Sequence, residues 1–139
     1  MSVITESRSM NNEMDLSIVA ELKNRGDMPL AMFRDFVGEV SDVEPHGDMQ
    51  VVNSDWNCLL CTGVSDEFIQ LMQRLTDNDL IEAKRMAESE AIFVHGYHGT
   101  EMYDMPVANE IPKNGYKKRR FAPTLIRAVT TPSLRYSST

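Results

Sequence analysis

A chain of 139 residues, 42% hydrophobic and 25% charged, predicts one globular, soluble domain with a single core. It has no apolar run near the roughly 20 residues that span a bilayer, no apolar signal-peptide stretch in "MSVITESRSMNNEMD", and only two cysteines. These features argue against a membrane protein, a secreted protein and a disulfide framework, and they favour a cytoplasmic one. The net charge of −7 disfavours nucleic-acid binding over the whole surface.

The N-terminal third predicts two helices. Residues 1–12 are polar and aperiodic, which predicts a mobile tail ahead of a single domain at 13–130. Helical spacing then begins, with apolar residues at Met14, Ile18 and Leu22. This first helix is expected to end at Gly26. A second helix is expected to start near Pro29, whose missing N–H costs nothing at a first helical position, with a stripe at Leu30, Phe33, Val37 and Val40.

The middle of the chain predicts strands followed by a helix. The segment "MQVVNSDWNCLLCTG" is rich in strand-forming residues and predicts one or two strands. Ser65 has the character of a helix N-cap, with carboxylates in the first turn behind it. The helix shows an apolar face at Phe68, Leu71, Met72 and Leu75. Thr76 and Asp79 resemble a capping box, which predicts a further helix to about Ala87.

The last third predicts extended structure. "AIFVHGYHG" predicts a strand that runs into a turn, and "EMYDMPVANEIP" predicts a second extended piece. "YKKRRFAPTLIRAVTT" predicts another strand, with Pro123 at a sheet edge or a bulge, and residues 131–139 predict a second mobile tail. The order of elements predicts an α+β fold, with N-terminal helices and a central helix packed on a small, mostly antiparallel sheet. A winged helix is compatible with this order.

The charge is divided sharply along the chain. From residue 113 onward every charged residue is basic: Lys113, Lys117, Lys118, Arg119, Arg120, Arg127 and Arg135. The residues before 113 therefore carry a net charge of −14. Such a division indicates an electrostatic function or internal pairing. The basic segment is free to contact phosphates, or to dock on the acidic body of the same chain.

Both cysteines stand at C-x-x-C spacing, and two histidines follow at H-x-x-H spacing. Cys58, Cys61, His95 and His98 match the ligand types of a zinc site. However, the cysteines are separated by two leucines rather than by a tight turn, and in a strand they would point to opposite faces. A redox C-x-x-C is disfavoured because the helix signal starts only at Ser65. We therefore interpret Cys58 and Cys61 as small buried side chains, and no metal or cofactor is expected.

A second cluster of polar side chains lies in "HGYHGTEMYD", which combines His95 and His98 with Glu101 and Asp104. Hydrolytic chemistry needs a general base beside a nucleophile or a metal-bound water. No nucleophile elbow, H-E-x-x-H helix or P-loop accompanies these groups. The cluster is therefore interpreted as solvated turn residues, and the protein is not expected to be an enzyme.

DNA binding is the second interpretation. "LTDNDLIEAKRM" could form the second helix of a helix-turn-helix, but acidic residues outnumber basic ones around it. The better candidate is the basic strand, in the position of a wing or arm: Tyr116, Lys117, Lys118, Arg119 and Arg120. This alternative is a winged-helix-like regulator that contacts phosphates through that strand.

The preferred interpretation is a non-enzymatic protein-interaction module. Ten methionines, whose side chains adapt to irregular surfaces, accompany the divided charge. An acidic surface favours encounter with a partner protein that has a basic surface. Inhibitors or adaptors of nucleic-acid-processing complexes, such as those made by phages, share this physical profile by analogy.

Overall fold

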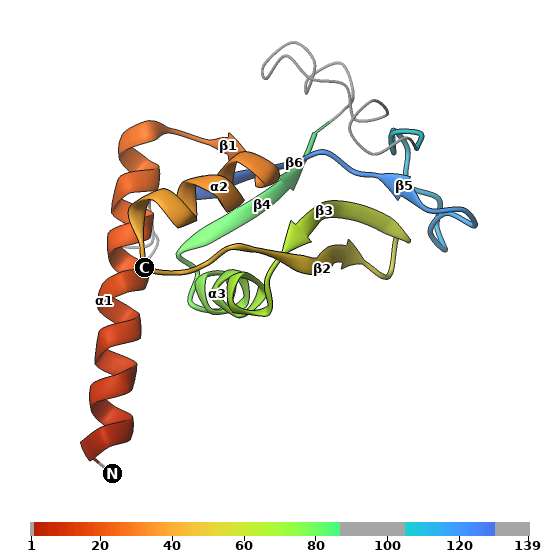
Figure 1. Ribbon diagram of the computed structural model, residues 1–139. Coiled ribbons are helices and arrows are strands. Elements are labelled where there is room, and N and C mark those ends of the chain that lie inside the picture. Colours follow the sequence, from red (N-terminus) through yellow and green to blue (C-terminus); the bar gives the residue numbers. More distant parts are fainter. Residues whose placement is uncertain (1, 87–104, 130–139) are drawn as a thin grey trace, which may run out of the picture.

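The computed structural model describes the backbone of residues 2–86 and 105–129, and the side chains from Glu13 onward within these ranges (Figure 1). The elements follow in the order α1 (Ser2–Arg25), β1 (Met28–Pro29), α2 (Leu30–Val40), β2 (His46–Asn53), β3 (Cys58–Val64), α3 (Asp66–Asp77), β4 (Ile81–Arg85), β5 (Arg120–Phe121) and β6 (Thr124–Ala128). The predicted α+β fold is confirmed. No helix of the described part is long and apolar enough to cross a membrane.

The strands form two small sheets instead of the predicted single one. One sheet has the order β1-β6-β4 and is antiparallel throughout. The other has the order β2-β3-β5, with β2 antiparallel and β5 parallel to β3. Pro123 lies between β5 and β6. These two strands are consecutive in the chain, but they belong to different sheets. Pro123 therefore marks a break in the predicted strand, and β6, which follows it, is the central strand of its sheet.

Helices α1 and α2 form where helical spacing predicted them. Helix α1 starts at Ser2, so its backbone runs through the segment expected as a tail, whose mobility stays a prediction. It ends as predicted at Gly26, which has φ of +96° and donates its N–H to the Leu22 carbonyl at 2.8 Å. Pro29 directly precedes α2. Within that helix, the side chains of Leu30, Phe33 and Val37 are buried. Figure 1 shows the N-terminal half of α1 projecting away from the sheets.

Helix α3 is capped as predicted. The Ser65 hydroxyl accepts the Phe68 N–H at 3.0 Å and donates to the Glu44 carbonyl at 2.6 Å. The hydroxyl thereby accepts one of the backbone N–H groups of the first turn that have no partner within the helix. It also links the helix to the loop before β2. Phe68, Leu71 and Leu75 are fully buried.

The helix predicted from Thr76 to about Ala87 is wrong, because α3 ends at Asp77 and β4 follows it. Asp79 has φ of +57°, Leu80 N–H donates to the Leu75 carbonyl at 2.9 Å, and Asp79 N–H donates to the Thr76 carbonyl at 3.1 Å. This is a Schellman motif, which stops a helix. Residues 81–85 then pair along their whole length with β6. They cannot serve as the second helix of a helix-turn-helix.

The main core lies among the three helices and the two sheets. Phe33 of α2 and Phe68 of α3 are fully buried there, with ring centroids 6.1 Å apart. A smaller cluster contains Cys58, Ala108 and Ala122, against which Trp56 and Tyr116 pack. This second cluster supports the segment that leads into β5.

Candidate interaction sites

The basic segment is anchored on the turn between β2 and β3. Tyr116 N–H donates to the Trp56 carbonyl at 2.9 Å. The Asn57 side-chain amide donates to the carbonyls of Tyr116 at 3.0 Å and Lys117 at 3.4 Å. Asn57 itself has φ of +56°, a conformation that asparagine tolerates better than most residues. The backbone of residues 115–117 is therefore held by a segment 59 positions earlier in the sequence.

The side chains of this segment point largely to solvent. Lys117, Lys118 and Arg119 are exposed, whereas Arg120 is half-buried and its guanidinium lies 4.7 Å from the centroid of the Tyr116 ring. The Tyr116 hydroxyl donates to the Glu110 carbonyl, which fixes the ring. The five predicted residues form one anchored basic surface.

The basic segment differs from the rest of the described molecule in its ion pairing. Arg25, Arg34, Arg74 and Arg127 each pair with a carboxylate. Within residues 13–86 and 105–129, no carboxylate pairs with the cations of the basic segment: Lys113, Lys117, Lys118, Arg119 and Arg120. Hydrogen bonds with the β2–β3 turn dock the segment on the described body, and they include one from Arg119 Nε to Asn57 Oδ1 at 3.3 Å. The cations of the segment carry no carboxylate partner from the described residues.

Gly115 allows the anchored turn to approach the β2–β3 turn closely. It has φ of +78°, and a Cβ at this position would lie 2.5 Å from the Asp55 carbonyl oxygen. We expect Gly115→Ala to detach residues 113–119 locally and to lower the free energy of unfolding by about 2 kcal/mol, from strain and lost hydrogen bonds. Amide hydrogen exchange should rise at Tyr116. Unchanged protection in this variant would contradict the described anchoring. The control is Gly26→Ala, which has the same kind of positive-φ strain, at φ of +96°, but whose Cβ meets open space.

The two cysteines pack into separate cores. Cys58 belongs to the small cluster and Cys61 to the main one, and both are fully buried. This agrees with the prediction that they point to opposite faces of a strand. Burial raises the pKa of the Cys58 thiol, although Arg85 and Arg120 oppose that rise electrostatically. A buried thiol of raised pKa is a poor nucleophile and a poor metal ligand.

The other predicted ligands are not described by the structure. His95, His98, Glu101 and Asp104 lie outside the described residues, so the structure tests neither the zinc candidate of Cys58, Cys61, His95 and His98 nor the polar cluster. Within residues 13–86 and 105–129 no group of three or more metal-ligating side chains comes together.

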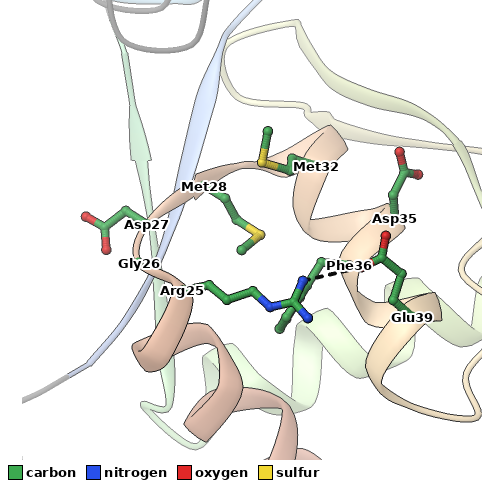
Figure 2. Close-up of a pocket in the computed structure, with 8 residues that line it drawn as sticks. All are labelled: Arg25, Gly26, Asp27, Met28, Met32, Asp35, Phe36 and Glu39. Carbon is green, nitrogen blue, oxygen red and sulfur yellow. Dashed lines mark hydrogen bonds and ion pairs between the residues drawn. The ribbon is translucent and has the colours of Figure 1, made fainter.

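A pocket that sequence reasoning missed lies where α1, β1 and α2 meet (Figure 2). Its volume is about 360 Å³, and it is lined by Arg25, Gly26, Asp27, Met28, Met32, Asp35, Phe36 and Glu39. Met32 is 53% exposed, the largest exposed fraction among the big hydrophobic side chains of the described part. Three carboxylates line the pocket with Met32, and each is paired with an arginine of the chain: Asp27 with Arg127, Asp35 with Arg34, and Glu39 with Arg25.

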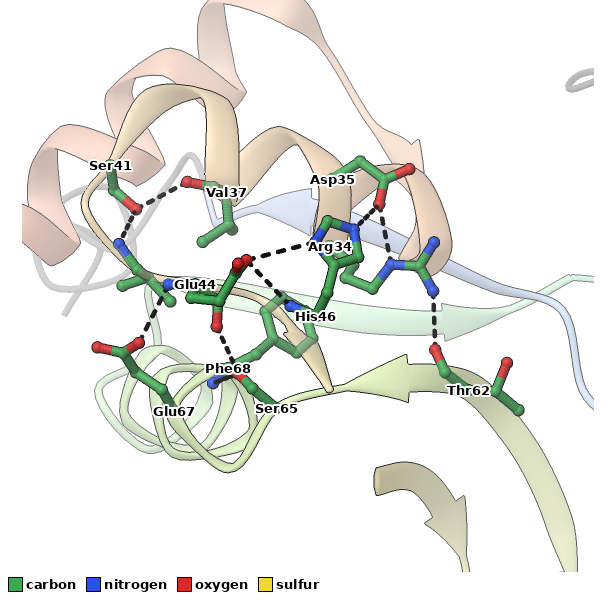
Figure 3. Close-up of polar contacts among 11 residues, drawn as sticks. Arg34, Asp35, Val37, Ser41, Glu44, His46, Thr62, Ser65, Glu67 and Phe68 are labelled. Carbon is green, nitrogen blue, oxygen red and sulfur yellow. Dashed lines mark hydrogen bonds and ion pairs between the residues drawn. The ribbon is translucent and has the colours of Figure 1, made fainter. Parts of the chain in front are cut away.

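Asp35 is held in place at the rim of this pocket (Figure 3). Its carboxylate accepts the Arg34 Nε–H at 2.9 Å and lies 2.8 Å from the His46 Nε2. Burial raises the pKa of Asp35, but the hydrogen bonds from Arg34 and His46 outweigh it, so the pKa lies below its ordinary value. Arg34 also donates to the Thr62 carbonyl at 2.8 Å. The network ties α2 to both β2 and β3 and keeps this carboxylate charged.

The sequence carries a faint signal for the pocket. Met28, Met32 and Phe36 recur every fourth residue, and Asp35 and Glu39 are also four apart. The helical spacing alone does not show that the turn at Gly26 brings Arg25 and Asp27 to the same place. That step needs the tertiary structure.

Comparison with known proteins does not identify these sites. No protein-family model, no curated protein and no solved structure matches the chain. The geometry and charge of the two surfaces described above are therefore what indicates a function.

Proposed function

We propose that the protein is a non-enzymatic interaction module that binds a partner protein through its acidic surface. The observation that carries this proposal is the exposed Met32 among the carboxylates of Asp27, Asp35 and Glu39. Met32 lies in a pocket rather than on a flat surface, and a concave site with apolar lining and a few polar groups is typical of a binding site. Carboxylates outnumber cations in the pocket lining, three to one, and this excess favours a partner with a basic surface.

The class of partner follows from the same charge argument. Proteins that handle nucleic acids expose lysine and arginine to bind phosphates, and an acidic protein can occupy that surface instead. We therefore propose an inhibitor or adaptor of a nucleic-acid-processing complex, acting without a cofactor. A cytoplasmic location is part of the proposal, because both cysteines are free thiols.

The test uses affinity capture from the native host with matched charge variants. Asp35→Asn/Glu39→Gln removes two negative charges from the pocket, whereas Asp48→Asn/Asp77→Asn removes two exposed charges from β2 and α3. We expect the pocket variant to recover at least about tenfold less of the partner, by analogy with paired charges in interfaces. The control variant should retain it. Equal retention by both variants, or no specific partner for the wild type, would contradict the proposal.

A second candidate function is nucleic-acid binding by the basic segment. The observation that favours it is the set of cations at Lys117–Arg120 that are anchored through the backbone but not paired with carboxylates of the described part. The expected contacts are to phosphates, since neither these residues nor β4 provides a recognition helix.

Fluorescence anisotropy with labelled single- and double-stranded DNA tests this second candidate. Affinity should fall steeply with salt, and Lys117→Glu/Lys118→Glu should abolish binding even at about 50 mM salt, where phosphate contacts are still strong. Lys23→Glu/Lys84→Glu is the matched control on α1 and β4, since both lysines are exposed. The absence of DNA binding at low salt would exclude this function.

A further inference from the structure

The acidic pocket already holds a guanidinium group, that of Arg25. The guanidinium carbon lies 5.0 Å from the centroid of the Phe36 ring. Its Nη1 donates to Glu39 Oε2 at 3.3 Å, and its Nε donates to Glu21 Oε1 at 3.2 Å. Figure 2 shows this side chain reaching from the end of α1 across the pocket. An aromatic face beside carboxylates is the chemistry that recognises arginine.

The unfilled part of the pocket continues this chemistry. Met32 offers exposed apolar surface on which the aliphatic stem of a long basic side chain can pack, and the buried Met28 lies beside it in the lining. The fixed carboxylate of Asp35 stands on the far side of that surface, and Glu39 is 63% exposed in its side chain. A second arginine therefore finds a stem site and two carboxylates with further oxygen lone pairs, since Asp35 accepts from Arg34 and His46 and Glu39 accepts from Arg25.

Arg25 is placed so that it can be exchanged. Its side chain is 45% exposed, and exposed ion pairs of this kind contribute little to stability. It is the last residue of α1, and Gly26 behind it has open space around its Cα. Phe36 is only 3% exposed because it lies beneath neighbours that include Arg25. Moving Arg25 aside would uncover the ring that an incoming guanidinium needs.

We propose that this pocket binds an arginine side chain of the partner protein, and that Arg25 is a built-in competitor for the position over Phe36. The inference rests on the proposed acidic interaction surface and names the group that this surface recognises. Lysine should bind more weakly, because its ammonium lacks the planar face that stacks on the ring and pairs with carboxylates in two places.

The experiment measures binding of capped tri-arginine, tri-lysine and tri-citrulline peptides by calorimetry and by ¹H–¹⁵N chemical-shift changes. The proteins are the wild type, Arg25→Ala and Lys23→Ala. Lys23 is the matched control, because it is an exposed cation in the same last turn of α1 and does not line the pocket. Both substitutions make the protein more negative by one charge, so any general electrostatic gain is shared.

The expected results are specific. Tri-arginine should shift the amides of Gly26 and Phe36 and bind more tightly than tri-lysine, and the uncharged tri-citrulline should not bind. Arg25→Ala should tighten tri-arginine binding about three- to fivefold more than Lys23→Ala does, the size of an exposed cation–π contact. An equal effect of the two substitutions, weaker binding by Arg25→Ala, or no binding by any protein would overturn the inference.

The outcomes also separate this inference from the proposed function. If Asp35→Asn/Glu39→Gln loses the captured partner while Arg25→Ala behaves like Lys23→Ala, the acidic interaction surface stands and the competitor role of Arg25 falls. If the pocket variant retains the partner as the control variant does, the proposed function falls.

Discussion

Replacing Arg74 by methionine is expected to lower the free energy of unfolding by about 3 kcal/mol, because it leaves a buried carboxylate without its partner. Asp15 is 3% exposed, and its two oxygens accept the Nε–H and an Nη2–H of Arg74, each at 3.0 Å. The hydrogen bond with Asp15 is also the main reason that the pKa of Arg74 lies above its ordinary value. This bidentate pair joins α1 to α3. Urea denaturation monitored by circular dichroism measures the loss.

The two partners should not be equivalent. Arg74 is 33% exposed in its side chain, so it can turn to water when Asp15 is replaced, whereas Asp15 has no such exit. We therefore expect Asp15→Asn to cost only about 1–2 kcal/mol. The double variant Asp15→Leu/Arg74→Met should recover most of the stability lost in Arg74→Met, since it buries no unpaired charge. A greater loss for Asp15→Asn than for Arg74→Met would contradict this description.

Replacing Phe68 by alanine is expected to lower the free energy of unfolding by about 4 kcal/mol. Phe68 is fully buried on α3 and faces Phe33 of α2 across the main core. Truncation removes the apolar area of the ring and leaves a cavity between two helices that cannot collapse freely.

Phe68→Leu is the matched control and should cost about 1–1.5 kcal/mol, since it keeps much of the volume. Chemical denaturation of the three proteins gives the comparison. A loss below about 1.5 kcal/mol for Phe68→Ala would mean that α3 does not close this core as described.

Local signals in the sequence predicted the elements whose cause is local. The helical spacing of Ile18 and Leu22 predicted α1, and Ser65 predicted the start of α3, because a cap acts within one turn. The packing of Cys58 and Cys61 on opposite faces followed from the period of a strand.

The predictions that went wrong concern choices made by distant partners. Residues 81–85 have a pattern compatible with a helix. They form a strand because they pair with residues 124–128. Pro123 signalled a break, but which sheet each neighbouring strand joins depends on β3, β4 and β1. The acidic pocket likewise depends on how α2 folds back against the end of α1. No spacing rule within one segment contains this information.

The central place of β6 sets the order in which the chain can fold. Asp27 and Arg127, which pair beside β1 and β6, are 100 residues apart in sequence, so the sheet β1-β6-β4 closes a very long loop. During synthesis α1 is made early, yet the core in which Ile18, Val19 and Leu22 are buried is complete only when β6 has been made. We expect refolding on the slow, millisecond-to-second scale of domains with many distant contacts.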